Sequence, residues 1–506
     1  MKKILTCNQM KALDENTIRG MHIPSVVLME RAALAVADQI RELPGEYPRV
    51  LVVCGSGNNG GDGLAIARLL QLQGINTDIY LAGDPKKMTP ETARQLESVK
   101  CYQISVTNNP VWDEYTVIVD AIFGVGLSRP VGGHYAELIR QMNDAKAFKV
   151  AVDIPSGISG DTGELLGTAF MADLTVTFAY IKRGLCLYPG RKYAGKVVTA
   201  DIGIYDKDAK GRELAANAAW YVEERDLAQL PQRASDGNKG TFGKVLFVAG
   251  SKGMCGAAYL CAAAALYAGT GMVKLQTVDE NRIPLQTLLP EAMLTCEFNQ
   301  QENEKNLDWC DVLVIGPGLG TNALSTERML WFLQNGHKKG KPIVLDADGL
   351  NLLAAHPGWL EYIDENTVLT PHIGEMSRLT GIQISDLKKD PVFHAVKYAG
   401  ETGAVCVLKD ACTVIADHNE KIYLNLCGNS GMATAGSGDV LSGLIAAALC
   451  MYLSEEDKTE LAYKAAMAVY LHGRSGDFAA EHTGSHGMTA RSMLGEIPGV
   501  LKLSER

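Results

Sequence analysis

Residues 435–443 read Ala435-Gly436-Ser437-Gly438-Asp439-Val440-Leu441-Ser442-Gly443. Glycines precede an acid and apolar residues at helical spacing follow it, which predicts a tight turn that opens into a buried helix. The bare N–H groups at a helix N-terminus bind anions, and glycine lets the backbone approach a phosphate closely. An acid beside a bound anion is a poor passive ligand because like charges repel, but it is well placed to take a proton from a nearby hydroxyl. The stretch therefore predicts phosphate chemistry with Asp439 as the base, with a plain Asp-capped helix start as the alternative.

The rest of the chain alternates short apolar runs with longer helical patterns, which is typical of parallel sheets covered by helices. A polar stretch over 204–211 lacks apolar periodicity and marks a boundary. We therefore expect two α/β domains, 1–215 and 216–506. The expected strands of the first are 50–54, 77–82, 117–121, 149–153, 174–179 and 197–201. Those of the second are 244–249, 272–277, 312–316, 343–346, 368–370, 405–409, 413–417 and 422–426, with closing helices over 432–451 and 461–477.

Composition excludes several classes of function. The net charge of −10 argues against a nucleic-acid binder, because no basic excess exists to neutralise phosphodiesters. No uninterrupted apolar run reaches the roughly 18 residues of a membrane-spanning helix, and the N-terminus lacks a signal-peptide core. The 12 cysteines contain no Cys-x-x-Cys pair, which predicts reduced thiols and a cytoplasmic location.

The first glycine-rich loop follows the strand expected at 50–54. Gly55, Gly57 and Gly60 satisfy the Gly-x-Gly-x-x-Gly fingerprint of dinucleotide-binding proteins. That fingerprint also requires an acid about 20 residues further on to bind the ribose. Asp84 is the candidate, but it follows Gly83 in a loop and the match is loose. The loop is therefore weak evidence for an NAD-dependent oxidoreductase.

Polar side chains also follow successive strands of the first domain. Asn59 lies in the polar loop 58–62, Asp120 and Asp153 close later strands, and Ser156 follows shortly after. The carboxyl ends of parallel strands converge on the ligand crevice of an open sheet. Asn59, Asp120 and Ser156 are then candidate oxygen ligands for a cation, and Asp153 is a candidate acid or base. The alternative is that each of these side chains merely caps a helix or turn.

Four segments of the first domain together resemble the NAD(P)H-hydrate epimerase family: 29–32, 57–63, 120–124 and 153–157. The resemblance covers residues 8–205 and implies a Rossmann-like, three-layer domain with a parallel sheet, which interconverts the isomers of hydrated NADH or NADPH. It implies a potassium ion on Asn59, Asp120 and Ser156 and a catalytic role for Asp153. The implied substrate contacts are Asn58, Asn59, Gly60, Gly61, Asp62, Gly124, Val125, Gly126, Leu127, Ser128, Arg129, Pro130 and Asp153. Lys182 is a further candidate acid or base, but we interpret it as a solvated lysine.

Segments of the second domain resemble the ADP-dependent NAD(P)H-hydrate dehydratase family, which has a ribokinase-like α/β fold. They are 240–244, 253–257, 316–320, 346–351, 370–376, 409–413 and 429–439, and the resemblance covers residues 225–500. It implies hydrate contacts from Gly256, Gly318, His372 and Asp439. It implies adenine-nucleotide contacts from Lys409, Asp410, Ala411, Cys412, Thr413 and Gly438. A structural role for His372 is the alternative, because a lone histidine is often a satisfied structural residue.

The implied reaction converts hydrated NAD(P)H back to NAD(P)H while ADP becomes AMP and phosphate. Asp439 removes the ring-hydroxyl proton, and the oxygen takes the terminal phosphoryl group of ADP with help from the N–H groups of 436–438 and Mg²⁺. Phosphate then leaves more easily than hydroxide. The expected partners are NAD(P)H hydrates and ADP or AMP, and we expect a homo-oligomer. The alternatives are a small-molecule kinase, an NAD-dependent oxidoreductase built on Gly55–Gly60, and a first domain that only binds or assembles.

Overall fold

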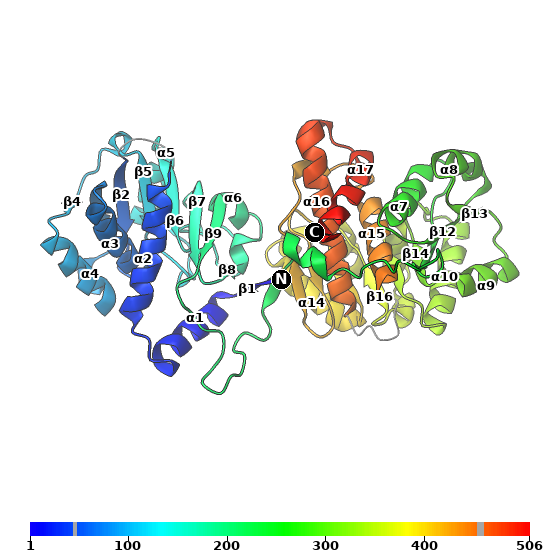
Figure 1. Cartoon of the computed structure of the whole chain (residues 1–506), viewed down its shortest axis with the longest axis horizontal. Helices are drawn as coiled ribbons and strands as arrows, with labels where there is room; N and C mark the ends of the chain where they lie inside the picture. Colours follow the sequence, from blue (N-terminus) through cyan, green and yellow to red (C-terminus); the bar gives the residue numbers. More distant parts are fainter. Residues whose placement is uncertain (44–47, 453–459, 506) are drawn as a thin grey trace. The chain divides into compact units, whose positions relative to one another are not determined.

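The chain folds into two compact units. The computed structural model describes residues 1–43, 48–452 and 460–505. The first unit is Lys3–Ala218, and the second is Ala219–Arg506 together with Met1–Lys2. Figure 1 labels the helices and strands of both units. The first unit ends at Ala218, three residues beyond the expected end of the first domain. Met1 and Lys2 were expected in the first domain but belong to the second unit.

The first unit is built on a parallel sheet whose strand order is β4-β3-β2-β5-β6-β7-β9. The strands are β2 (Arg49–Cys54), β3 (Asn76–Leu81), β4 (Ser105–Thr107), β5 (Val117–Ala121), β6 (Phe148–Val152), β7 (Leu174–Phe178) and β9 (Lys196–Ala200). All six expected strands are present, and β4 is additional. The strand order reverses at β2, which has β3 on one side and β5 on the other. In such a sheet, the loops after the two strands at the reversal diverge and leave a ligand crevice between them.

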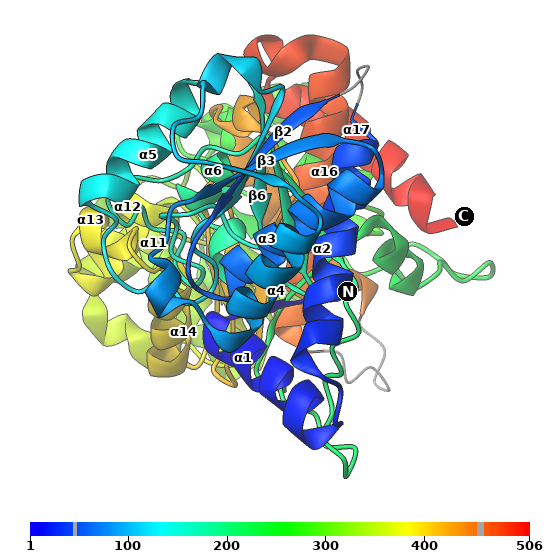
Figure 2. The same cartoon turned by 90° about the vertical axis from the view of Figure 1, so that its left-hand side faces the viewer.

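Helices cover both faces of this sheet. Along β2, Val50 and Val52 pack into a core shared with α2 (Ser25–Arg41) and α3 (Asn58–Leu72), whereas Leu51 packs on the opposite face with α5 (Gly133–Asp144). This alternation is the period of two that a strand buried on both faces requires. Figure 2 shows α2, α3 and α4 (Pro90–Cys101) on one side of the strands and α5 on the other. The expected three-layer α/β domain is confirmed.

Two short elements complete the first unit and border its crevice. Strand β1 (Lys2–Leu5) pairs in parallel with β8 (Ile181–Lys182), so that Leu5 lies opposite Lys182. Helix α1 (Cys7–Glu15) follows β1, and a capping box formed by Thr6 and Gln9 starts it. The beginning of the chain is thereby held against β8, which lies between β7 and β9 in the sequence.

The second unit contains a larger sheet with strand order β13-β12-β11-β14-β15-β16-β17-β18-β19-β10. It is parallel from β13 to β17 and antiparallel between β17, β18 and β19. The strands are β10 (Ala219–Tyr221), β11 (Lys244–Val248), β12 (Met272–Gln276), β13 (Met293–Thr295), β14 (Val312–Ile315), β15 (Ile343–Leu345), β16 (Thr367–Leu369), β17 (Val405–Leu408), β18 (Val414–Ala416) and β19 (Ile422–Leu424). Every strand expected here is present.

Helices also cover both faces of the second sheet (Figure 1). The helices α7 (Cys255–Tyr267), α15 (Ser437–Met451), α16 (Leu461–Gly487) and α17 (Ala490–Leu501) share a core with inward-facing residues such as Val245 and Phe247. On the opposite face, α10 (Ala323–Lys338) packs so closely that a Cβ on Gly336 would lie 3.1 Å from Ile343. The expected α/β class is confirmed for this unit too. No helix in the described part of the chain is both long and apolar enough to cross a bilayer.

Candidate active sites

The first unit contains a cavity of about 790 Å³ at the reversal point of its sheet. It is lined by the loop after β2, by the loop after β5 and by Asp153 at the end of β6. Ten of the residues predicted from the sequence to contact substrate line it: Asn58, Asn59, Asp62, Gly124, Val125, Gly126, Leu127, Ser128, Arg129 and Asp153. The fold therefore brings together three loops that are far apart in the sequence.

Three predicted contact residues lie elsewhere. Gly60 and Gly61 are buried inside the first turn of α3, where a Cβ on Gly60 would lie 1.9 Å from the Gly55 carbonyl oxygen. These two glycines allow close packing of the loop and do not line the cavity. Pro130 lines a smaller, separate hollow of about 250 Å³ with Phe123 and Arg129. Asp84 also lies outside the cavity lining, because its carboxylate accepts the Lys86 N–H and caps a short 3₁₀ turn.

Asp153 is held in one orientation by a buried lysine. The Lys182 side chain is 1% exposed, so the expectation that it is solvated was wrong. Its three N–H bonds are directed at Asp153 Oδ1 (2.5 Å), Thr177 Oγ1 (3.1 Å) and the Phe178 carbonyl oxygen (2.8 Å). Asp153 Oδ1 also accepts from Thr177 Oγ1 and from the Phe178 N–H. All these bonds fall on one oxygen, so among the described residues Oδ2 receives no hydrogen bond, and Asp153 lines the cavity.

The backbone at Asp153 is strained. Its φ of 67° lies in the left-handed region that non-glycine residues rarely adopt. Such strain costs about 1–3 kcal/mol and persists where surrounding structure enforces it, most often at functional sites. At Asp153 this strain coincides with the buried ion pair to Lys182. The strand-end position of Asp153 could be predicted from the sequence, whereas this ion pair could not.

Two further carboxyl groups face the same cavity. Asp14, from α1, was not predicted to belong to the site, and Asp62 lies in the first turn of α3. Burial and the neighbouring Asp153 charge raise the pKa of Asp14. Burial, Asp153 and Asp14 raise the pKa of Asp62 well above its ordinary value. The sequence does carry a signal for Asp14, because it lies at helical spacing from Met10 and Thr17 on the buried face of its helix.

The predicted cation ligands lie beside the cavity. Asp120 is fully buried, and its carboxylate accepts from the Ser156 hydroxyl (2.7 Å) and the Ser156 N–H (2.7 Å). Burial outweighs these bonds and raises the pKa of Asp120 to about 6. Ser156 Oγ also accepts from the N–H of Phe123, and the Asn59 amide lies beside Gly124. The fold thus brings Asp120 and Ser156 into contact and places Asn59 on the adjoining loop.

In the second unit, the glycine-rich turn starts α15 as the sequence predicts. Gly436 is the N-cap with φ 89°, and a Cβ there would lie 2.4 Å from Leu260 Cδ1, so both conformation and space require glycine. Asp439 follows in the first helical turn. Among the described residues, none donates a hydrogen bond to its carboxyl group. Burial, together with the nearby Asp346 charge, raises the pKa of Asp439 to about 7.

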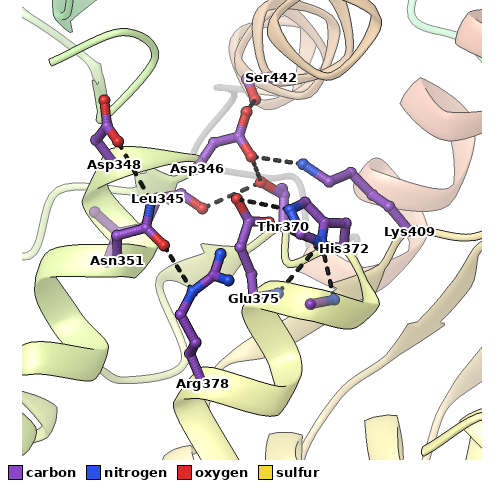
Figure 3. A network of polar contacts seen from close by, with 11 residues as sticks. Leu345, Asp346, Asp348, Asn351, Thr370, His372, Glu375, Arg378, Lys409 and Ser442 are labelled. Atoms are coloured by element: carbon purple, nitrogen blue, oxygen red, sulfur yellow. Dashed lines mark hydrogen bonds and ion pairs between the residues drawn. The ribbon is translucent and has the colours of Figure 1, made fainter. Parts of the chain in front are cut away.

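Asp346, at the end of β15, differs from Asp439 in that both of its carboxylate oxygens accept hydrogen bonds. Figure 3 shows these bonds to Asp346. Its Oδ1 accepts from Lys409 Nζ (2.7 Å) and Thr370 Oγ1 (2.7 Å), and its Oδ2 accepts from Ser442 Oγ (2.6 Å). Burial alone would raise the pKa of Asp346, but the Lys409 charge and these bonds outweigh it and lower the pKa. Asp346 therefore stays ionised. The sequence placed it in a strand-end segment but did not predict this role, because its partners lie on three other elements.

Lys409 and Gly438 meet at this network. Lys409 follows β17, and a Cβ on Gly438 would lie 3.4 Å from its Nζ and 3.9 Å from Asp346 Oδ2. The Lys409 ammonium therefore lies close to the N-terminus of α15, where both present positive charge to an anion. The rest of the predicted nucleotide loop diverges: Asp410 and Ala411 are exposed, Cys412 is buried and Thr413 is half-buried.

His372 both caps a helix and presents a donor. Its Nδ1 accepts from the N–H groups of Gly374 (2.9 Å) and Glu375 (3.2 Å) at the start of α12 (Ile373–Thr380). Burial and the positive charges of Lys409 and Arg378 lower the pKa of His372, so the ring is neutral near pH 7. A neutral ring that accepts at Nδ1 carries its proton on Nε2. Nε2 lies 3.5 Å from Glu375 Oε1, but the His372 side chain is 54% exposed, so a ligand can compete for this Nε2–H.

The two predicted glycines of the hydrate site lie on adjacent segments. Gly256 is the second residue of α7, and a Cβ there would meet no atom within 4 Å. Gly318 has φ 59°, and a Cβ there would lie 2.9 Å from Ala257 and 3.0 Å from the Met254 carbonyl oxygen. The Gly318 carbonyl also accepts from the N–H of Ser251 (2.6 Å). The start of α7 and the Gly316–Gly320 loop therefore approach each other closely only because glycine is present.

Comparisons with known proteins agree in both units. Residues 245–499 match the family model described as NAD(P)H-hydrate dehydratase, and residues 25–184 match the model described as YjeF-related protein N-terminus. The bifunctional NAD(P)H-hydrate repair enzyme Nnr of Thermofilum pendens is 37% identical, over 99% of this chain and 96% of the relative. The Moorella thermoacetica protein of the same name is also 37% identical, over the same shares. Among solved structures, a ribokinase-like superfamily protein from Enterococcus faecalis matches with a TM-score of 0.51 and 29% identity, over 56% of this chain and 95% of that chain.

Proposed function

The chain belongs to the family of bifunctional NAD(P)H-hydrate repair enzymes, and we propose that its first unit is the epimerase and its second unit the dehydratase. The proposed domains are 1–215 and 216–506. The first interconverts the R and S forms of hydrated NAD(P)H. The second dehydrates the S form to NAD(P)H while ADP becomes AMP and phosphate. A dehydratase specific for one isomer leaves the other unrepaired, which explains why one chain carries both activities.

The observation that carries the dehydratase proposal is the contrast between Asp439 and Asp346. A general base works best when its pKa lies near the operating pH, and Asp439 has a pKa of about 7 and no hydrogen bond to occupy it. Asp346 is ionised and fully bonded. When the surroundings shift the pKa values of two nearby carboxyl groups in opposite directions, the two groups have different roles in the reaction. Asp439 is the group that exchanges a proton, and Asp346 positions Lys409.

The proposed reaction follows from this placement. Asp439 takes the proton of the ring hydroxyl, and the hydroxyl oxygen attacks the terminal phosphorus of ADP, which releases AMP. The N–H groups at the start of α15 and the Lys409 ammonium stabilise the charge that develops on the phosphoryl oxygens. The C–O bond then breaks, phosphate departs with that oxygen, and the ring nitrogen supplies the electron pair. Loss of a proton from the neighbouring carbon restores the dihydronicotinamide.

Magnesium fits this site only together with the nucleotide. Among the described residues, no group of three or more His, Cys, Asp or Glu side chains is arranged to hold a metal ion. Mg²⁺ usually binds one or two carboxylates plus the phosphates of the substrate. Asp348, whose charge acts on Asp439, is the carboxyl group that would hold it, which leaves Asp439 free to act as the base. When bound, the ion would neutralise the phosphate charge.

Potassium fits the first unit better. The Asp120 carboxylate is fully buried, and its acceptor bonds come from Ser156 and the Ile122 N–H, with no cation among its described neighbours. The Asn59 amide nitrogen is buried without a hydrogen-bond partner, so the protein does not fix the orientation of that amide. We propose that Asn59, Asp120 and Ser156 hold K⁺. The ion would neutralise the buried carboxylate and order the loop after β5.

We further propose that the protein works as a homo-oligomer in the cytoplasm. All 12 cysteines are free thiols, which suits a reducing compartment. The net charge of −10 argues against nucleic acids as partners. Light scattering of the purified chain tests the oligomeric state.

One experiment tests the two activities together. The purified chain is incubated with a mixture of R and S hydrates, with and without ADP, and both isomers are followed by chromatography. Without ADP, an unequal mixture should move to equilibrium. With ADP, both isomers should disappear, the near-ultraviolet absorbance of NADH should return, and AMP and free phosphate should form. A stable phosphorylated alcohol would instead indicate a small-molecule kinase, and an unchanged isomer ratio would indicate a first unit without catalysis.

A further inference from the structure

Ionisable side chains from four separate elements face the cavity of the first unit. They are Asp14 of α1, Asp62 of α3, Asp153 after β6 and Lys182 of β8, and each of them lines the same space. The sequence comparison drew attention to the loops after the strands, but α1 lies before the first strand of the main sheet. Its contribution to the cavity arises because β1 and β8 pair and hold the beginning of the chain there.

Inversion at the hydrated ring carbon needs two proton transfers. This carbon bears a hydroxyl group and is bonded to the ring nitrogen. If the hydroxyl loses its proton, the oxygen forms a C=O bond and the C–N bond breaks, with its electron pair passing to nitrogen. The nitrogen then takes up a proton. After rotation of the aldehyde, the reverse steps close the ring on the other face. The site must therefore supply one group that accepts a proton and one that donates it.

Asp153 suits the accepting role. Lys182 pairs with its Oδ1, and the other oxygen has no hydrogen bond from the described residues. Lys182 does not suit the donating role, since an ammonium has three N–H bonds and all three are engaged by Asp153, Thr177 and the Phe178 carbonyl. Lys182 is thus a positioning residue, and the donor must be another side chain.

Two carboxyl groups remain. Asp62 lies three residues after Asn59 in α3, so both side chains project from the same face of that helix. Because Asn59 is a proposed K⁺ ligand, Asp62 belongs to the cation side of the cavity. Asp14 comes from a different element, α1, and no hydrogen bond or ion pair from the described residues reaches its carboxyl group. It is half-buried and opens onto the cavity.

We infer that Asp14 is the second proton-transfer residue of the epimerase, donating to the ring nitrogen as Asp153 accepts from the hydroxyl. The inference rests on the proposed function of the first unit. The charged groups that face Asp14 are Asp153, Asp62 and Lys182 across the cavity and Lys11 on its own helix. Because Asp14 must carry its proton to act, exchange should slow as the pH rises through its pKa.

The test uses the full-length chain and measures exchange between the R and S hydrates without ADP. Asp14→Asn should lower the kcat of exchange about 100-fold, the lower end of the range for general acid–base catalysis, and change KM less than about threefold. Asp14→Glu should recover part of the rate, with the falling limb of its pH profile shifted. The matched control is Glu15→Gln, which removes an exposed carboxylate from the adjacent position of the same helix and should exchange at the wild-type rate.

The outcomes separate the inference from the function on which it rests. A wild-type chain that does not exchange the isomers would contradict the proposed function of the first unit. A wild-type chain that exchanges them, with Asp14→Asn within about threefold of it, would overturn only the role of Asp14. If Asp14→Asn unfolds the first unit, the pH profile of Asp14→Glu decides: a shifted limb supports the inference, and an unchanged limb overturns it. ADP-dependent dehydration of the S isomer by the same samples reports the concentration of active second unit.

Discussion

The two units neutralise a strand-end aspartate in the same way but use it differently. Asp153 follows β6 and pairs with Lys182; Asp346 follows β15 and pairs with Lys409. In the first unit all the bonds fall on one carboxylate oxygen, so the other remains free for a ligand. In the second unit both oxygens are occupied, so the carboxylate serves to fix its lysine. The same type of ion pair thus leaves one carboxylate oxygen free in the first unit and fixes a lysine in the second.

The surroundings explain this difference. The first cavity opens between diverging strand ends and is lined by side-chain carboxyl groups, which suits proton transfer. The second site lies at the N-terminus of α15, where backbone N–H groups and Lys409 suit a phosphate. The proton-exchanging group that we propose there is Asp439, in the first turn of that helix. Single substitutions should show that the activity of each unit depends on the carboxyl group of that unit.

The largest effect is expected for Asp439→Asn. The change keeps the size of the side chain but removes the base, so dehydration of the S hydrate should fall about 10³-fold. Binding of ADP, measured by calorimetry, should remain, because the N–H groups and Lys409 are unchanged. Isomer exchange by the first unit should equal that of the wild type. Dehydration within tenfold of the wild type would remove Asp439 from the reaction.

Removing the two lysines compares the ion pairs directly. Lys182→Met leaves the Asp153 carboxylate buried without a counter-charge, which should destabilise the first unit by about 3–5 kcal/mol. Lys409→Met should cost the second unit less, because hydroxyl groups still bond to both oxygens of Asp346. Urea unfolding followed by circular dichroism measures both. The double variant Lys182→Met with Asp153→Asn should recover much of the loss; equal stability of the two single variants would contradict the comparison.

The potassium proposal is specific to the first unit. Asp120→Asn removes the charged ligand but keeps a side chain of similar size, so isomer exchange should fall about 10–100-fold, as expected for changes at a metal site. Exchange by the variant should no longer respond to replacement of K⁺ by Na⁺. The control is dehydration with ADP, which should be unchanged in the same buffers. A variant that still responds to K⁺ would place the ion elsewhere.

The pH dependence should distinguish the two acids of the second unit. Burial raises the pKa of Asp439 to about 7, so the base is protonated and inactive below that pH. Dehydration at saturating substrate should therefore rise about tenfold per pH unit up to pH 7 and level off above it. Asp346, whose pKa is lowered, should add no second limb in this range. A rate independent of pH between 5 and 7 would contradict the assignment of Asp439.

The smallest effect concerns His372, which has two roles. His372→Asn keeps a side chain that caps α12 but removes the Nε2–H donor, so KM for the hydrate should rise about threefold to tenfold, equivalent to one hydrogen bond. His372→Ala removes both, and should in addition lower the free energy of unfolding by about 1 kcal/mol. Steady-state kinetics and thermal unfolding separate the two effects. Unchanged kinetics in His372→Asn would make the residue purely structural.

Local signals in the sequence were sufficient for the framework. The strands follow from apolar runs, the turn at Gly436 from a glycine before a helix, and the positions of Asp153 and Asp439 from an acid at a strand end or helix start. Each of these signals depends only on a few consecutive residues and on the period of a helix or strand. Each can therefore be recognised from the sequence alone.

Tertiary structure decided which of these side chains are charged, paired or free. Lys182 was expected in solvent, but pairing of β1 with β8 buries it beside Asp153. Asp14 joined the site only because its helix lies across the cavity. Protonation and pairing depend on how much water is excluded and on which charges approach from distant segments. Those segments meet only after folding, so the pattern of residues identifies the acids but leaves their roles to the three-dimensional packing.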